Sequence, residues 1–209
     1  RDGLSRENQV DAAILHNRIE SALFELDEFE EWAWNPLYYV RLSVNSVYGL
    51  LARDFAPLEE RLGNAASRLE QFPRFFAQAR TSLQPERVPK IHAETAIRQN
   101  PGLGTIIDTM IVPEMDALTT VQRERLEAAI ETARDAVAEH QTWLEEDLLP
   151  RAAGDFRIGA ELYDTKLAFT LDSPLSRKEI RARAEAEYES VRNRMYETAK
   201  EVYAQVYPY

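Results

Sequence analysis

The chain has 209 residues and a formal charge of −11, because 36 acidic side chains outnumber 25 basic ones. A nucleic-acid-binding protein neutralises phosphates with clustered Lys and Arg, and no basic run of that kind occurs, so we expect no nucleic-acid partner. Cysteine is absent, which excludes disulfides, thiolate metal sites and cysteine nucleophiles. The chain contains only 7 glycines, and its composition favours helices over turn-rich β-structure.

The chain begins at Arg1 without a charged-then-apolar leader, so we expect any signal segment of the natural protein to lie outside these residues. No stretch approaches the roughly 18 consecutive apolar residues that a membrane-spanning helix requires. We therefore expect no membrane-spanning segment. The residues themselves leave the compartment and the oligomeric state open.

The first predicted helix runs from a cap at Ser5 to about Glu31. Its apolar residues recur at steps of three and four, the spacing that places side chains on one face of an α-helix. They are Leu15, Ile19, Ala22, Leu26 and Phe29. Five shorter helices follow, mostly beginning at a proline, because proline is tolerated in a first helical turn and breaks a helix interior. They cover residues 36–51, 57–71, 73–83, 89–99 and 102–111.

A second long helix is predicted over residues 119–149, and Pro150 ends it. His140 falls on the apolar stripe of this helix, which predicts a hydrogen-bonded histidine in the core or at its boundary. The sequence Ala-Ala-Gly-Asp within residues 151–155 predicts a break in the helical organisation.

A third long helix is predicted over residues 176–207, where Ser176 and Glu179 form a capping box. Its stripe again follows steps of three and four: Ile180, Ala184, Tyr188, Val191, Met195, Thr198, Val202 and Val206. The predicted elements together indicate an all-α fold, an irregular multi-helix bundle with long amphipathic helices. We expect a single helical region over residues 1–209.

The three histidines, His16, His92 and His140, do not match the patterns of helical metal sites. None has a second histidine four residues on, as a zinc helix requires, and none has a glutamate three residues before it, as a di-iron bundle requires. Gly154 and Gly159 have the spacing of a phosphate-binding loop, but its lysine is missing, so we interpret them as turns. The sequence indicates no catalytic residue and no metal ligand in this chain.

Aromatic rings and polar groups occur together in two clusters, at residues 32–39 and 156–163. Core packing is the default interpretation of such rings, and a binding-site wall is the alternative. Arg157, Tyr163 and Lys166 surround a predicted helix start at Gly159, where exposed amides and positive charge favour a carboxylate-bearing ligand. We therefore predict that Arg157 and Tyr163 bind substrate.

His92 and Glu94 form the second candidate pair for substrate binding. They follow the bend predicted at Pro89, where they would contribute to a polar pocket. The alternative is that both side chains are structural, as most helix histidines are.

Several of these segments resemble a known family, the large bacterial all-helical proteins termed domain of unknown function 885. The resemblance extends from about residue 4 to residue 200 and depends on the combination of its motifs. They are Trp34-Asn35-Pro36-Leu37-Tyr38, Arg53-Asp54-Phe55-Ala56-Pro57, His92-Ala93-Glu94-Thr95-Ala96-Ile97, Gly154-Asp155-Phe156-Arg157-Ile158-Gly159 through Tyr163 and Leu167, and Leu171-Asp172-Ser173-Pro174-Leu175-Ser176.

The resemblance implies that this chain is the N-terminal, cleft-forming part of a zincin-like peptidase. Family members are longer and carry, downstream of this region, a His-Glu-x-x-Pro-Gly-His signature that resembles a zinc-binding helix. This implies zinc in the full-length parent but no cofactor in this fragment, which alone would be inactive.

The implied partners are a peptide substrate and the C-terminal half of the parent chain, and the implied location is exported or lipid-anchored in bacteria. In this reading Arg157 holds a peptide carboxylate, Tyr163 offers a ring face and a hydroxyl, and His92 with Glu94 orients polar groups. The alternative function is a non-catalytic helical binding or scaffold module.

Overall fold

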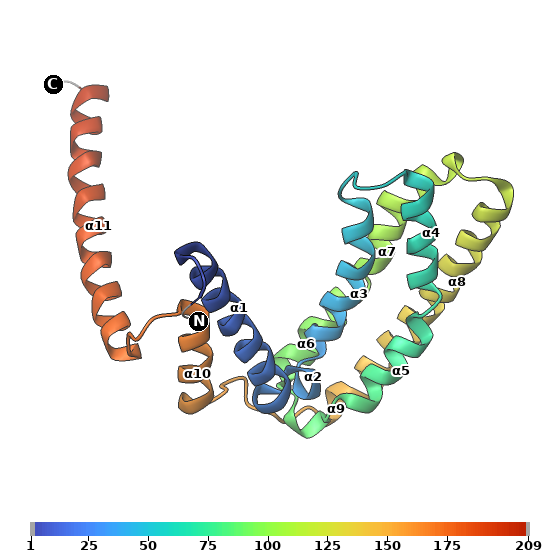
Figure 1. Cartoon of the computed structure of the whole chain (residues 1–209), viewed down its shortest axis with the longest axis horizontal. Helices are drawn as coiled ribbons and strands as arrows, with labels where there is room; N and C mark the ends of the chain where they lie inside the picture. The colour runs from blue at the N-terminus through green and yellow to red at the C-terminus, as the bar shows by residue number, and fades with distance from the viewer. Residues whose placement is uncertain (1–2, 208–209) are drawn as a thin grey trace. The chain divides into compact units, whose positions relative to one another are not determined.

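The computed structural model describes residues 3–207 and confirms the all-α fold, because the described chain forms helices and no strand. A β-type contact within that range is an isolated bridge between Pro89 and Gly154. The helices fall into two compact units, one of residues 25–157 and one of residues up to 24 and from 158 onward (Figure 1). Each unit has its own internal contacts, and the expectation of a single helical region over residues 1–209 stays a prediction.

The larger unit is a helical bundle in which α8 packs along α4 and α5, while α3 packs against α4 and α6. Its α-helices are α2 (Glu31–Trp34), α3 (Pro36–Leu51), α4 (Leu58–Leu69), α5 (Phe72–Ser82), α6 (Lys90–Gln99), α7 (Gly102–Ile106), α8 (Thr120–Trp143) and α9 (Leu149–Arg151). Shorter π-helical or 3-10 turns cover Glu25–Phe29, Pro85–Arg87, Ile107–Ile111, Val112–Ala117 and Leu144–Leu148.

Apolar side chains at helical spacing form the core of the larger unit. On α4, Leu62 and Leu69 are fully buried and share one cluster with Leu126 of α8. A second cluster lies around α6, where Ala93 and Leu144 are fully buried. Burying a leucine side chain stabilises a fold by roughly 1.5–3 kcal/mol, so these stripes account for the packing of the amphipathic helices.

Side-chain caps determine where several helices begin, and the capping box predicted at Ser176 and Glu179 is confirmed. The Ser176 hydroxyl accepts a hydrogen bond from the backbone N–H of Glu179, and the Ser176 N–H donates to the Glu179 carboxylate at 2.9 Å. Thr119 and Gln122 form the same reciprocal box at the start of α8. Each box satisfies amides that the first turn of a helix leaves without an intrahelical acceptor.

The predicted first helix is wrong at its C-terminal end. The α-helix α1 (Arg6–Phe24) stops seven residues before Glu31 and continues as the π-helical turn Glu25–Phe29. Glu30 then takes a left-handed backbone conformation with φ of 47°, which no α-helix continues through, and its carboxylate is paired with Arg87 at 2.8 Å. The predicted helix over 119–149 is likewise α-helical only to Trp143, because a π-helical turn follows.

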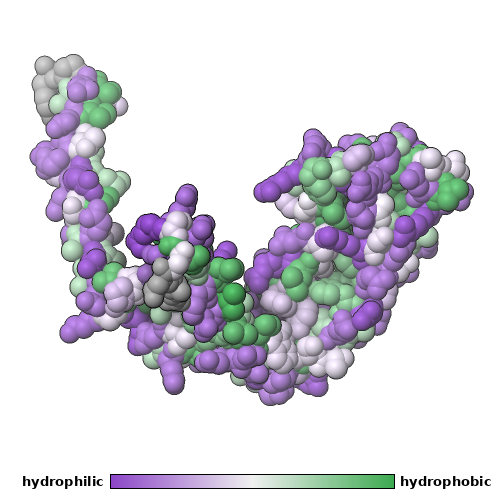
Figure 2. Space-filling view, in the orientation of Figure 1, coloured by the Kyte–Doolittle hydropathy of each residue, from purple (hydrophilic) through white to green (hydrophobic). Residues whose placement is uncertain are grey.

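The smaller unit contains α1, α10 (Ala160–Leu171) and α11 (Arg177–Val206). α1 and α10 are in contact, since the Asn17 side-chain amide donates to the Phe169 carbonyl at 3.1 Å and the Phe24 and Phe169 rings lie 5.7 Å apart. Along α11, every residue from 181 to 206 is exposed, including the predicted apolar stripe from Ala184 to Val206 (Figure 2). None of the helices within residues 3–207 combines the length and the low charge that crossing a bilayer requires.

Candidate functional site

The segment around residue 34 forms a folded helix junction. Asn35 caps α3, because its side-chain oxygen accepts from the Leu37 N–H at 3.1 Å. Its side-chain amide donates to Glu31 at 2.7 Å, and Glu31 also accepts from Arg41 at 3.3 Å. Pro36 occupies the first turn of α3, where proline costs no hydrogen bond. The Trp-Asn-Pro-Leu-Tyr motif therefore builds a helix start.

His92, a predicted site residue, lies beside this junction. Its ring stacks on the Trp34 indole at a centroid distance of 5.7 Å, and the indole N–H donates to the Phe29 carbonyl at 2.9 Å. Within residues 3–207, the buried Nδ1 atom of His92 has no hydrogen-bond partner. Burial lowers the pKa of His92, and the negative charge of Glu31 opposes that shift. The ring is therefore neutral at pH 7 and can donate one hydrogen bond and accept one.

The structure does not pair His92 with Glu94. The two residues stand two positions apart on α6, and side chains at that spacing point to different faces of a helix. Glu94 makes no ion pair in the part of the chain that the structure describes. Of the two, His92 has the environment of a functional group.

The Arg157 side chain is exposed, and its contacts are with its neighbours in the sequence. Its guanidinium lies 3.5 Å from the Asp155 carboxylate and 4.4 Å from the centre of the Phe156 ring. The backbone N–H of Arg157 also donates to Asp155 at 2.9 Å. The side chain is 72% exposed, so water screens the ion pair, and the guanidinium can exchange Asp155 for another carboxylate at little cost.

Tyr163 lies in the first turns of α10, which begins after Gly159 as predicted. Gly159 has a φ of 85°, a left-handed conformation that favours glycine, and its carbonyl accepts from the Tyr163 N–H at 3.2 Å. Tyr163 is 47% exposed. Arg157 ends the larger unit, and Tyr163 belongs to the smaller one.

Gly154 has a structural role that the sequence did not indicate. A Cβ atom at this position would lie 2.0 Å from the carbonyl oxygen of Arg87. The Gly154 N–H donates to the Val88 carbonyl at 2.9 Å, which fastens the chain after α9 to the segment before α6. Glycine is thus required at position 154 because the backbone of residues 87 and 88 lies so close, and no local sequence pattern shows this.

His140 is a core residue, as its place on the apolar stripe predicted, but the predicted hydrogen bonding is wrong. Its ring is fully buried and stacked between Phe76 at 4.4 Å and Trp143 at 5.6 Å. Neither ring nitrogen has a hydrogen-bond partner within residues 3–207. Burial, with a contribution from the positive charge of Arg80, lowers the pKa of His140 to about 3. A neutral histidine enclosed by two rings serves packing and is closed to substrate.

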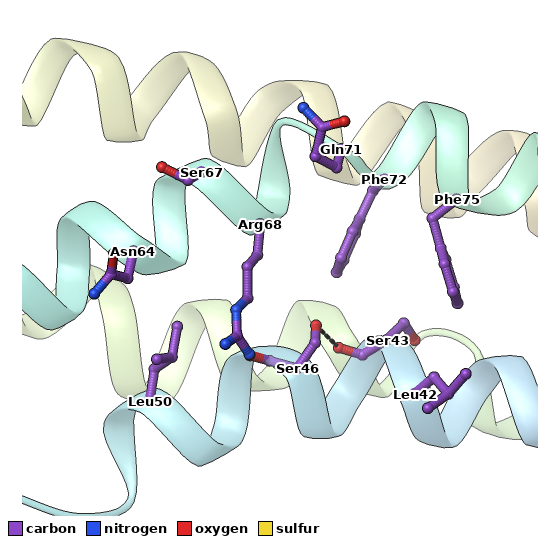
Figure 3. Close-up of a pocket in the computed structure, with 10 residues that line it drawn as sticks. All are labelled: Leu42, Ser43, Ser46, Leu50, Asn64, Ser67, Arg68, Gln71, Phe72 and Phe75. Carbon is purple, nitrogen blue, oxygen red and sulfur yellow. Dashed lines mark hydrogen bonds between the residues drawn. The ribbon is translucent and has the colours of Figure 1, made fainter.

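A pocket of about 500 Å³ lies between α3 and the α4–α5 pair of the larger unit (Figure 3). Phe72, Phe75 and Leu42 form an apolar wall, and Arg68 extends from α4 towards Ser46 on α3. The Arg68 guanidinium donates to the Ser46 carbonyl. The sequence alone did not indicate this pocket, because the pattern of polar and apolar residues on α4 also fits an ordinary amphipathic helix.

Metal ligands do not gather in the described residues. No group of three or more His, Asp or Glu side chains that could hold a metal ion occurs within residues 3–207. Of the three histidines, His140 is enclosed by aromatic rings and His16 is exposed on α1. The residues of this range therefore do not fit a zinc centre.

Comparison with known proteins places the chain in a family. Among solved structures, the chain is similar to one described as a "putative lipoprotein of unknown function" from Shewanella oneidensis, with 23% identity and a TM-score of 0.80. That match covers 100% of this chain and 38% of the other, so this chain spans well under half of its structural neighbour, and at this identity the likeness concerns the fold. A search of curated proteins found no match. The model of the family described as "bacterial protein of unknown function (DUF885)" matches residues 1–207, and the chain therefore belongs to this family.

Proposed function

We propose that this chain is the substrate-binding helical part of a zinc-dependent peptidase whose metal-binding helix lies outside residues 1–209. The pocket between α3 and the α4–α5 pair is the observation that supports binding. Its volume of about 500 Å³ falls in the range typical of small-ligand sites, and apolar side chains dominate its wall. The peptidase activity and the zinc come from the family resemblance, and the described residues contribute no metal ligand set.

The pocket suits an extended peptide better than a compact polar ligand. Leu42 is 40% exposed and Phe75 is half-buried, so both give the apolar side chain of a peptide a surface to cover. Asn64 also lines the pocket, and its side-chain amide can pair with a peptide group of a ligand. In the zinc-dependent peptidase that we propose, His92, Arg157 and Tyr163 are further substrate contacts.

The test uses the full-length natural protein and a mixture of unstructured peptides. We expect cleavage that a chelator abolishes and zinc restores, together with zinc bound at one or more equivalents per chain. Cleavage that persists in chelator, or a protein that binds no zinc, would contradict the peptidase proposal.

Alanine substitutions of the predicted contacts test the role of this chain within that protein. Arg157→Ala and Tyr163→Ala should change KM or kcat at unaltered melting temperature if these residues contact substrate. Arg74→Ala is the control, since Arg74 is exposed on α5 and does not line the pocket. A melting change without a kinetic change would assign the two residues to structure alone.

A second candidate function is a non-catalytic module that binds a protein partner through α11. The observation in its favour is the exposed apolar stripe, on which Met195 is 68% and Val206 is 61% exposed. Exposed apolar patches of this kind mark interaction sites. If this function holds, charged substitutions on the stripe abolish partner binding. The unsubstituted full-length protein then cleaves no peptide.

We also propose that the natural protein is exported or lipid-anchored. The support is the description of a structural neighbour as a "putative lipoprotein", together with the family resemblance. Fractionation of cells that express the full-length protein should place it in the envelope, from which detergent releases it. Recovery in the cytosolic fraction would overturn this proposal.

A further inference from the structure

We infer that the α3/α4–α5 pocket binds the free C-terminal end of a peptide whose last residue is large and apolar, with Arg68 holding the terminal carboxylate. This inference deepens the proposed function and depends on it for the identity of the ligand as a peptide. Arg68 was not among the residues that the sequence indicated.

The charge of the pocket favours an anion. Arg68 is the one charged side chain among the described residues that line it, although the whole chain carries a formal charge of −11. Within residues 3–207, no carboxylate forms an ion pair with Arg68. Other arginines nearby differ, since Arg61 is paired with Asp54 at 2.8 Å and Arg125 with Glu70 at 2.7 Å. Asp54 and Glu70 are thus engaged with other arginines, and the charge of Arg68 is left for a ligand.

The geometry of Arg68 favours a carboxylate. One guanidinium nitrogen donates to the Ser46 carbonyl, which holds the side chain across the space between α4 and α3 (Figure 3). Guanidinium has five N–H donors in a planar fork, so two parallel donors remain for the two oxygens of a carboxylate. A single positive charge beside apolar walls matches one negative charge better than the double charge of a phosphate.

The apolar wall selects the residue that carries the carboxylate. Figure 3 shows Phe72 and Phe75 projecting from α5 towards α3, on the same side of Arg68 as Leu42. These side chains lie where the last side chain of a peptide would enter once its carboxylate is bound to Arg68. Leu42 is 40% exposed, so a ligand that covers it gains apolar burial at about 25 cal/mol per Å².

The polar rim favours a peptide over a fatty acid. In the described part of the chain, the side-chain amides of Asn64 and Gln71 make no hydrogen bond to another residue. The Ser43, Ser46 and Ser67 hydroxyls are occupied, because they donate to the carbonyls of Val40, Ser43 and Gly63. The Asn64 amide is thus available to a peptide bond of a ligand, whereas the chain of a fatty acid offers it no partner.

The experiment measures binding to the full-length protein by calorimetry in the presence of a chelator, which separates binding from zinc-dependent cleavage. The probes are N-acetyl-alanyl-alanyl-phenylalanine as the free acid and as its C-terminal amide. We expect the acid to bind at least about tenfold more tightly than the amide, because charge-assisted hydrogen bonds are roughly twice as strong as neutral ones.

The variants assign that difference to one side chain. Arg68→Met keeps the aliphatic stem and should lower the affinity for the acid to that for the amide, whereas Arg74→Met should leave both affinities unchanged. Leu42→Ser should weaken both probes by a similar factor. The comparison of acid with amide on the unsubstituted protein stands even if a variant melts early.

Three results would overturn the inference. They are equal affinity for the acid and the amide, equal behaviour of Arg68→Met and Arg74→Met, and binding of decanoate that depends on Arg68 without binding of the peptide acid. A full-length protein that binds the acid through Arg68 but cleaves no peptide would refute the peptidase proposal while retaining this site.

Discussion

The histidine stacked in the core makes the native state sensitive to acid. The pKa of His140 is about 3 in the fold against 6.5 for an exposed histidine, so the unfolded chain binds a proton that the folded chain does not. The contribution of His140 to stability is therefore complete above pH 6.5 and is lost as the pH falls from 6.5 towards 3. Within that window, each fall of one pH unit lowers the free energy of unfolding by about 1.4 kcal/mol.

The variant His140→Phe should remove most of this pH dependence. Phenylalanine keeps the stack between Phe76 and Trp143 and introduces no polar atom, so stability at pH 7.5 should be equal or higher. Urea unfolding at pH 7.5 and pH 5 measures the effect, with His16→Gln as the exposed control. An unchanged difference between the two pH values in His140→Phe would contradict the assignment.

Gly154 should tolerate no side chain. The Cβ of alanine would meet the Arg87 carbonyl at 2.0 Å, so the backbone must move and the hydrogen bond to Val88 must lengthen. Overpacking of this kind costs about 1–3 kcal/mol, and we expect Gly154→Ala to lower the free energy of unfolding by that amount.

Gly63→Ala is the matched control for Gly154→Ala. Gly63 lies inside α4 with nothing within 4 Å of its would-be Cβ, so alanine should stabilise the helix by about 0.5–1 kcal/mol. Chemical denaturation of both variants gives the comparison. Equal effects at the two glycines would show that the contact between Gly154 and Arg87 is absent in solution.

At the scale of the helices, the exposed stripe of α11 should cause the isolated chain to self-associate. Met195 and Val202 are 68% and 51% exposed, and a contiguous apolar face in water favours association. Sedimentation of the 209-residue chain should show mass that rises with concentration. The double variant Met195→Lys with Val202→Lys should remain monomeric, whereas Asn193→Lys, on the opposite face, should not change association.

The helices were predictable from sequence where residues close in the chain, such as caps and prolines, determine where a helix begins and ends. The predicted range 36–51 is the observed range of α3, because Pro36 and the Asn35 cap define its start. The π-helical turns were not predicted, since one extra residue in a turn leaves the apolar spacing almost unchanged. The left-handed Glu30 was missed for another reason, because its partner Arg87 is remote in sequence.

The candidate site was less predictable than the fold. Its pocket requires side chains from α3, α4 and α5 to meet, and no single segment carries that information. Arg68 looked like an ordinary surface residue of an amphipathic helix, and only its position opposite Ser46 distinguishes it. His92 was indicated by residue type, but its stacking on Trp34 depends on how α6 packs.

At the scale of the whole molecule, the boundary between the two units should be the first point of proteolysis. Arg157 ends the larger unit, lies in non-helical chain between Asp155 and Gly159, and has a side chain that is 72% exposed. Brief trypsin digestion should therefore cut first after Arg157, as read by mass spectrometry. Arg157→Gln should remove that cut, and a first cut inside α8 would contradict the expectation.

The chain near both ends of the larger unit is bonded to the short segment at residues 84–89. The Gln84 N–H donates to the Ala33 carbonyl at 2.8 Å, Arg87 holds Glu30 at 2.8 Å, and the Val88 carbonyl accepts from Gly154 at 2.9 Å. In a polypeptide of residues 25–157, both terminal regions would thus be held to this one internal segment by hydrogen bonds and an ion pair, which limits fraying of the ends. That makes it a natural candidate for production as an autonomous domain, suited to crystallisation and to ligand screening by NMR.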